Sequence, residues 1–220
     1  MLFDKFLELI PKIEKEPLLS SEAHIKMAPL ERLKYYENYD YSIHNPRKSA
    51  VLSLFYPKDT QTNLLLIVRS EYPGIHSAQI SFPGGKMETF DASLQETALR
   101  ETEEEVGITK DKIQIIKPFS ELYIPPSNFL VSPFMGITTE AIFPKIDSRE
   151  VSHILELPIH DLLDNRLISN VKLSTSYAKN IEVPAFIISD HIVWGATAMI
   201  LSEIKQVINK ILEINSPMLR

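Results

Sequence analysis

The sequence predicts a mixed α+β fold with a helical N-terminal extension. Short runs of aliphatic and β-branched residues, bounded by turn residues, recur from about residue 50 to residue 188 and are typical of strands. Two longer segments, one acidic near residue 100 and one apolar near the end, repeat their apolar residues at helical spacing instead. A length of 220 residues with 44% hydrophobic residues is suited to one globular domain with extensions.

The extension is expected to cover residues 1–48 and to precede a domain over residues 49–220. Apolar residues recur near its start at helical spacing: Leu2, Phe3, Phe6, Leu9 and Ile10. A loop containing proline follows this helical pattern. Two strands are then expected at 50–56 and 63–69, joined by a turn at 57–60.

A glycine pair lies at the centre of the next part of the chain. After a loop over residues 71–77, a strand over 79–82 is expected to run into a loop at Gly84-Gly85. Glycine at such a position allows the backbone to approach a neighbouring group closely. Asp91 or Ser93 can then cap the start of the acidic helix.

The remaining elements alternate strands with helices. They are strands at 113–124, 131–137, 171–176 and 183–188 and a short helix at 158–163. Two prolines, Pro125-Pro126, interrupt the first pair of these strands. The last helix is expected from about residue 196 to residue 214, with a buried face formed by Ile200, Ile204, Val207, Ile208 and Ile211.

The acidic helix is the most informative segment of the chain. It carries four glutamates within five residues before it ends at Gly107. These charges repel one another and oppose the helix dipole unless cations compensate them. At 100° per residue, Glu101, Glu104 and Glu105 fall within one arc of about 100°, whereas Glu103 points away, toward solvent or Arg100.

The surroundings of this arc indicate a metal site. Ala98, Leu99, Thr102 and Val106 form a neighbouring, mostly apolar stripe that can pack on a sheet. The three carboxylates then stand at the edge of a buried face. Their hard oxygen atoms suit Mg²⁺ or Mn²⁺, which commonly bridge the phosphate oxygens of a substrate. A solvated acidic helix end is the alternative interpretation.

The glycine pair, loop and helix together resemble the Nudix box, the signature of Nudix hydrolases. That signature reads G-x5-E-x7-R-E-U-x-E-E-x-G-U, where U is aliphatic, and its metal-binding half fits the run from Arg100 to Ile108. Counting from Gly85, Asp91 stands where the family has glutamate, and eight residues rather than seven separate it from Arg100. Thr102 replaces the aliphatic residue. The resemblance implies a Nudix-type α/β/α sandwich around a mixed β-sheet.

Residues outside the box resemble the coenzyme A pyrophosphatase branch of the family. That branch reads L-L-T-x-R-[SA]-x3-R-x3-G-x3-F-P-G-G, and the spacing from Arg69 to Phe82 agrees with it. Ile67, Gly74 and Ala78 depart from the pattern. Gly74 stands in place of the second arginine, so that a guanidinium group suited to binding phosphate is missing. The missing positive charge can be supplied by Lys86, by His76 or by a basic residue of the N-terminal segment. The segment 192–198 also resembles the branch, so that the resemblance covers about residues 50 to 211.

The resemblance implies metal-assisted hydrolysis of a nucleoside diphosphate derivative, most simply coenzyme A or acyl-coenzyme A, giving 3′,5′-ADP and 4′-phosphopantetheine. It implies that Glu101, Glu104 and Glu105 bind Mg²⁺ or Mn²⁺ with the Gly85 carbonyl. One of these glutamates, or a further carboxylate, then serves as general base. Hydrolysis of ADP-ribose or a dinucleotide is an alternative, as is a catalytically silent Nudix domain that binds a ligand.

Basic residues are the candidates for orienting the glutamates and for binding the substrate. Arg100 is expected to orient the glutamates, since Glu103 and Glu104 lie three and four residues after it. Arg69 is the candidate for a substrate phosphate contact, and an ordinary arginine at the end of a strand is the equal alternative. Lys86 and His76 are further candidates for substrate binding.

Other residues carry weaker signals. The six histidines show no spacing typical of a zinc site. Tyr123 and Asn128 are candidates for lining a pocket, although a packed tyrosine is the simpler interpretation, and Trp194 is expected in the core. Glu121 and Glu140 are candidates for a distal carboxylate, although an exposed acid is the simpler interpretation for each.

Composition narrows the class of protein. The absence of cysteine excludes disulfides and thiol chemistry, and a net charge of −6 disfavours a broad nucleic-acid surface. Asp4 and Glu8 interrupt the apolar N-terminus, which is therefore not a secretory signal. Because no run of about 18 apolar residues exists, a cytoplasmic enzyme acting on a small-molecule substrate is expected, without membrane or nucleic-acid partners. A homodimer is compatible with the apolar faces of the terminal helices.

Overall fold

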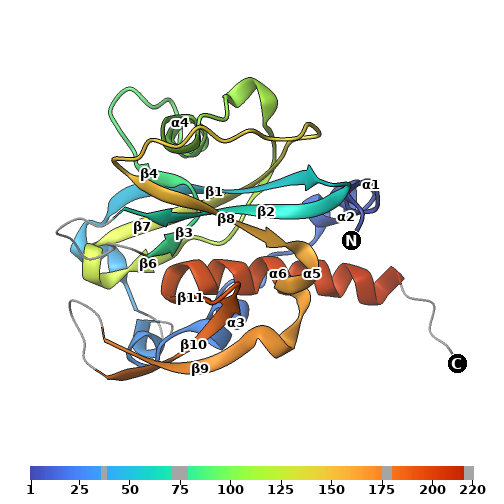
Figure 1. Cartoon of the computed structure of the whole chain (residues 1–220). Coiled ribbons are helices and arrows are strands. Elements are labelled where there is room, and N and C mark those ends of the chain that lie inside the picture. Colours follow the sequence, from blue (N-terminus) through green and yellow to red (C-terminus); the bar gives the residue numbers. More distant parts are fainter. Residues whose placement is uncertain (36–38, 71–78, 175–179, 216–220) are drawn as a thin grey trace, which may run out of the picture.

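The computed structural model describes residues 1–35, 39–70, 79–174 and 180–215. A mixed sheet forms its middle layer, with helix α4 (Leu94–Val106) on one face and helix α6 (Gly195–Asn215) on the other (Figure 1). The predicted α+β class and α/β/α sandwich are confirmed, as are the N-terminal helices. The boundary at residues 48 and 49 stays a prediction.

Three strands organise the central sheet. Strand β1 (Arg47–Lys58) pairs antiparallel with β2 (Gln61–Arg69) through a tight turn and parallel with β7 (Phe129–Ile137). The main path of the sheet runs β3-β2-β1-β7-β5, and β4, β6 and β8 pair beside it with β1, β7 and β2. The bounds of these other strands are Ile80–Ser81 for β3, Gly84–Lys86 for β4, Gln114–Pro118 for β5, Leu122–Ile124 for β6 and Val151–Pro158 for β8.

The two faces of β1 and β2 belong to different apolar clusters because side chains alternate along a strand. Leu52 and Leu65 pack in the cluster beneath α4. Phe55 and Leu64 face the opposite way, into the larger cluster around α6. The expected stripe on α4 is buried as predicted, and so is the expected face of α6.

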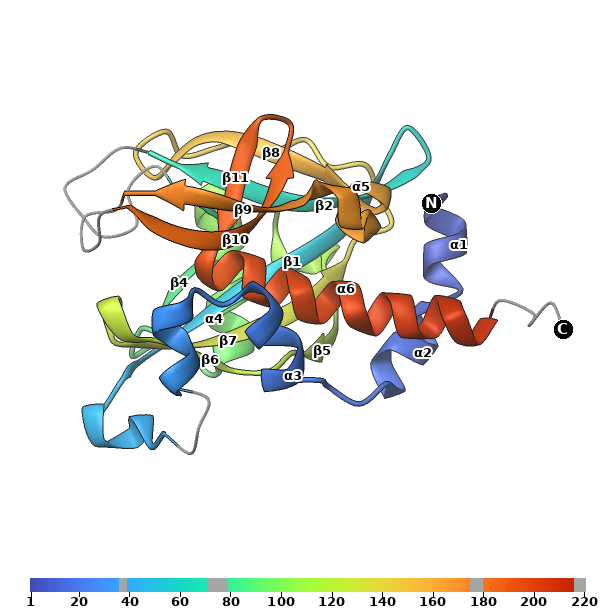
Figure 2. The same cartoon turned by 90° about the horizontal axis from the view of Figure 1, so that it is seen from below.

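A second, three-stranded sheet lies beyond α6 (Figures 1 and 2). It consists of β9 (Ile168–Leu173), β10 (Ile181–Ile188) and β11 (His191–Trp194), all antiparallel. The short helix α5 (Ile159–Leu163), which the sequence predicts at 158–163, joins β8 to this sheet. Strand β11 leads directly into α6, and this connection fixes where the helix begins.

The N-terminal segment packs along α6 (Figure 2). Its elements are α1 (Phe3–Leu7), α2 (Ile10–Lys15), α3 (Ser21–His24) and the 3₁₀ turns η1 (Ile25–Met27), η2 (Leu30–Tyr35) and η3 (Tyr41–His44). A buried carboxylate anchors this segment. Glu203 of α6 accepts hydrogen bonds from Ser20 N at 2.7 Å and Ser120 N at 3.0 Å, and His24 Nε2 lies 3.4 Å from it.

Several predicted boundaries are wrong. The single strand expected at 113–124 divides into β5 and β6, and the strand β8 was not predicted. Histidine and glutamate weaken the apolar alternation of β8, although Val151, Leu155 and Leu157 are buried. The short strand β11 was also not predicted, because the segment 192–198 was noted only for its resemblance to the branch. The loop expected at 71–77 lies outside the described residues.

Among the helices in the described part of the chain, none combines the length and apolar character needed to cross a membrane.

Glu203 gives a prediction about acid stability. Burial raises the pKa of its carboxyl, but hydrogen bonds from His24, Ser120 and Ser20 outweigh burial and lower the pKa from 4.5 to about 2. The stabilisation from this carboxylate is therefore present above pH 4.5 and is lost as the pH falls toward 2. Glu203→Gln should lower the free energy of unfolding at pH 7 by about 1–3 kcal/mol.

Urea unfolding of both proteins at pH 7, 5 and 3.5 measures this difference. The gap between wild type and Glu203→Gln should narrow at pH 3.5. An equal gap at all three pH values would contradict the assigned pKa.

Candidate active site

Helix α4 begins and ends where the sequence predicts. The Ser93 hydroxyl accepts a hydrogen bond from Glu96 N at 3.2 Å, and Gly107 ends the helix at φ 71°. Ser93 is therefore the N-cap. Asp91, the other candidate for that role, has a different one that is described below.

The glycine pair brings the sheet edge against α4. Gly84 and Gly85 form strand β4, paired with Val51 and Ala50 of β1, and not the loop that was expected. A Cβ atom on Gly84 would stand 2.3 Å from the Ala50 carbonyl oxygen, and one on Gly85 would stand 2.5 Å from the Glu101 carboxyl group. The backbone therefore approaches its neighbours closely at both positions, as was predicted, but only at Gly84 is the neighbour itself backbone.

Glu105 is the buried member of the glutamate group. Its side chain is 1% exposed, and its two oxygens accept hydrogen bonds from Arg69 Nη1 at 2.9 Å and Gly84 N at 2.8 Å. Burial raises the pKa of this carboxyl to about 7, although Arg69 and the Gly84 amide act in the opposite direction. Glu105 thus ties α4 to both β2 and β4.

Arg100 gathers the other carboxylates. Its Nη1 donates to Glu101 Oε1 at 2.8 Å and to Glu104 Oε2 at 3.1 Å, and its Nη2 also donates to the Lys86 carbonyl at 3.1 Å. The expected orienting contact with Glu104 is present. The expected contact with Glu103 is not among the bonds of Arg100 to the described residues, because Glu103 lies on the exposed side of α4.

Asp91 holds Arg100 from the opposite side. Its two oxygens accept from Arg100 Nε at 2.8 Å and Nη2 at 2.9 Å, and it also accepts from Thr97 Oγ1 and Glu88 N. The Arg100 guanidinium holds the pKa of this carboxyl well below its usual range. The Asp91 carboxylate therefore holds the arginine by accepting two hydrogen bonds side by side, an arrangement that matches the planar guanidinium.

These carboxylates match a hard divalent cation in the chemistry of their donor atoms, which are all oxygens. In the described residues, no three acidic or histidine side chains are arranged closely enough to hold a metal as they stand. Arg69 and Arg100 engage Glu105, Glu101 and Glu104 instead. The Glu104 side chain is 60% exposed, so that packing does not fix its position.

One acidic residue near this group was not predicted. Glu150, just before β8, lies 3.8 Å from Arg69 Nη2, and its charge contributes to raising the pKa of Glu101 and Glu105. It was missed because β8 itself was missed. The two acids considered from the sequence have other partners: Glu121 accepts from Ser132 Oγ at 2.7 Å, and Glu140 lies 3.6 Å from Lys112 Nζ.

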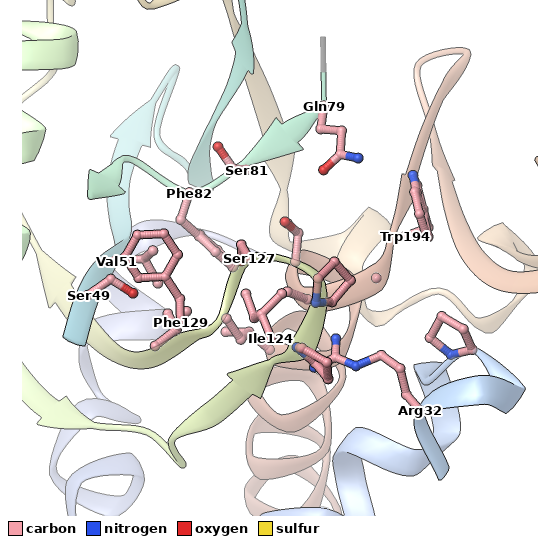
Figure 3. Close-up of a pocket in the computed structure, with 18 of the residues that line it drawn as sticks. Arg32, Ser49, Val51, Gln79, Ser81, Phe82, Ile124, Ser127, Phe129 and Trp194 are labelled. Atoms are coloured by element: carbon pink, nitrogen blue, oxygen red, sulfur yellow. The ribbon is translucent and has the colours of Figure 1, made fainter. Parts of the chain in front are cut away.

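A cleft of about 560 Å³ lies on the α6 side of the sheet (Figure 3). Its wall includes Gly84, Gly85, Lys86 and Arg69, so that β4 separates the cleft from the carboxylates and contacts both. Much of the remaining wall comes from distant segments: Pro29, Glu31, Arg32, Lys34 and Tyr35 of the N-terminal segment, Ile124 to Ser127, Phe129, Trp194, and Gly195 to Thr197 and Ile200 of α6.

The structure assigns places to the remaining candidates. Trp194 was expected in the core but lines the cleft. Lys86 lines the cleft, and its Nζ lies 3.3 Å from Glu88 Oε1. Tyr123 donates to Asn128 at 3.0 Å and stacks on Tyr41, as expected for a packed tyrosine. His76, with Gly74 and Ala78, lies outside the described residues.

Comparison with known proteins identifies a family. The NUDIX domain profile matches residues 46–174. An uncharacterized Nudix hydrolase, NudL, from Photorhabdus laumondii is 32% identical over 74% of this chain and 85% of its own length. NudL of Yersinia enterocolitica is also 32% identical, over 68% and 75%. A solved Nudix hydrolase from M. smegmatis, RenU, superposes with a TM-score of 0.50 at 11% identity, over 80% of this chain and 91% of its own, and shows a similar fold.

The two glycines give opposite predictions. Gly84→Ala should lower the melting temperature by several degrees, because its Cβ meets backbone and its φ is +153°. Gly85→Ala should keep the melting temperature close to that of wild type, because its Cβ meets the end of the flexible Glu101 side chain. Displacement of Glu101 should lower diphosphate hydrolysis about a hundredfold.

Thermal unfolding and steady-state kinetics of both variants check this contrast. Full activity in Gly85→Ala would show that the position of Glu101 against β4 is not needed for turnover.

Proposed function

The chain belongs to the Nudix hydrolase family, and we propose that its substrate is coenzyme A or an acyl derivative. Nudix hydrolases act on nucleoside diphosphate derivatives and generally use divalent metal ions. In the proposed reaction the diphosphate linkage is hydrolysed with Mg²⁺ or Mn²⁺, and the products are 3′,5′-ADP and 4′-phosphopantetheine.

One observation supports this choice above the others. The residues that resemble the coenzyme A pyrophosphatase branch and those that resemble the Nudix box meet at one end of the cleft. Arg69, Phe82, Gly84 and Gly85 line the cleft, while Arg69 and Gly84 also bond to Glu105 of α4. A diphosphate lying over β4 would contact both groups, and the rest of the substrate would occupy the cleft.

We assign the site residues on this basis. Glu101, Glu104 and Glu105, with the Gly85 carbonyl, are the residues that would hold the metal, which supplies charge neutralisation at the phosphates and lowers the pKa of a bound water. Arg100 is a positioning residue, because it holds Glu101 and Glu104 while Asp91 holds it. Glu150 joins the candidates for general base because it lies beside this group.

Phosphate binding falls to the basic residues at this end of the cleft. Arg69 is partly exposed and lines the cleft while it pairs with Glu105 of α4. It can therefore contact a phosphate and keep its bond to Glu105. Lys86 is half exposed and follows the glycine pair directly. His76 stays a proposed substrate contact from the sequence alone.

Substitution of two neighbouring glutamates distinguishes the loss of a metal ligand from the loss of one negative charge. Glu104→Gln should keep the fold and lower kcat about a hundredfold or more, because it removes one negative oxygen donor from the proposed metal site. Glu103→Gln changes the same charge one residue earlier, on the exposed side of α4, and should leave kcat unchanged. Near-normal turnover of Glu104→Gln at saturating Mg²⁺ would contradict the assignment.

A substrate panel tests the proposed reaction. Coenzyme A, ADP-ribose, NADH and a diadenosine polyphosphate are incubated in parallel with Mg²⁺ and with Mn²⁺, and the products are separated by chromatography. Preferential release of 3′,5′-ADP from coenzyme A is expected. Turnover of another compound alone would keep the hydrolase and replace the substrate, and silence on all four with metal bound would favour a ligand-binding domain.

A further inference from the structure

The cleft has a second basic group, away from the carboxylates. Arg32 and Lys34, both on the N-terminal turn η2, line it together with Arg69 and Lys86. Among the described lining residues, Glu31 is the acid that partly offsets them. In a chain of net charge −6, this gathering of cations around one cleft indicates an anionic ligand.

The position of Arg32 is fixed by its surroundings. Its Nη1 donates to Met199 Sδ at 3.3 Å, and its Nη2 donates to the Tyr123 carbonyl. Figure 3 shows the side chain extending from the N-terminal segment toward Ile124, on the side of the cleft away from Phe82 and Val51. Contacts with α6 and β6 therefore hold an arginine at the wall of the cleft.

Two further features favour a phosphate over other anions. Gly195, Ala196 and Thr197, the first residues of the 21-residue helix α6, form the adjoining wall, and the N-terminus of a helix favours negative charge. A phosphate monoester carries close to two negative charges at pH 7, which matches one arginine and one lysine better than a single carboxylate does.

We propose that Arg32 and Lys34 bind a phosphate monoester of the substrate, distinct from the diphosphate that is cleaved. The inference rests on the proposed function, because it extends the same cleft to a second phosphate on the nucleotide. It also explains how a chain with Gly74 in place of the second arginine of the pattern still recognises such a substrate: a cation from the N-terminal segment takes over.

Binding without catalysis tests the proposal. The full-length, metal-free protein is titrated calorimetrically with 3′,5′-ADP, 2′,5′-ADP, 5′-AMP and inorganic phosphate. Wild type should bind one of the two bisphosphates about tenfold or more tightly than 5′-AMP. Arg32→Met and Lys34→Met should each reduce this preference while changing 5′-AMP binding little.

Arg47 provides the matched control. It donates to the Ser127 carbonyl at 2.9 Å and lies 4.1 Å from the centre of the Phe129 ring, so that it contacts two lining residues without lining the cleft itself. Arg47→Met should leave the preference unchanged. Melting temperatures identify any variant that fails to fold, and the exposed Lys34 still tests the proposal if Arg32→Met does fail.

The outcomes separate this proposal from the proposed reaction. Equal binding of all nucleotides by wild type, a preference unchanged in both Arg32→Met and Lys34→Met, or an equal loss in Arg47→Met would overturn it. Binding of inorganic phosphate as tightly as the preferred bisphosphate would overturn it by indicating a site for free phosphate. A preference for 2′,5′-ADP that the variants lose would support this phosphate site while it argues against coenzyme A, and the hydrolysis panel reports on the reaction independently.

Discussion

The buried carboxylate of Glu105 is the contact on which the candidate site depends. It receives the Arg69 guanidinium from β2 and the Gly84 amide from β4 while its own helix packs on the sheet. A carboxylate that is 1% exposed would be costly without such partners. This one interaction therefore sets how far α4 stands from the sheet edge, and through Gly85 it also sets where Glu101 lies.

The cleft shows how specificity can be separated from chemistry in this fold. Strand β4 carries contacts to the carboxylates on one side and forms the cleft wall on the other. The far wall comes from the N-terminal segment, β11 and the start of α6, none of which belongs to the acidic helix. Changes in those segments can alter the ligand while the arrangement of Glu101, Glu105 and Arg100 stays intact.

Features of the site that depend only on residues close together in the sequence were predicted correctly. The cap at Ser93, the end at Gly107 and the apolar stripe of α4 follow from spacing and side-chain type alone, and the structure confirms all three. The close approach at Gly84 and Gly85 was predicted as well, although their pairing with β1 was not.

What depends on contacts far apart in the sequence was not predicted. Strand β8 owes its conformation to pairing with β2, almost ninety residues earlier in the chain, so that neither the strand nor Glu150 beside it stood out. Asp91 was considered only as an alternative helix cap, because its bond to Arg100 needs the folded loop. Trp194 and Arg32 line the cleft only because α6 brings their segments together. Spacing cannot reveal such neighbours.

The most direct test of this account measures whether the carboxylates of α4 bind a divalent cation. Mn²⁺ can be titrated into the full-length protein while electron paramagnetic resonance follows the free ion. Wild type should bind Mn²⁺, Glu105→Gln should weaken binding about tenfold or more, and Glu103→Gln should not change it. Equal Mn²⁺ binding by wild type and Glu105→Gln would contradict the central claim.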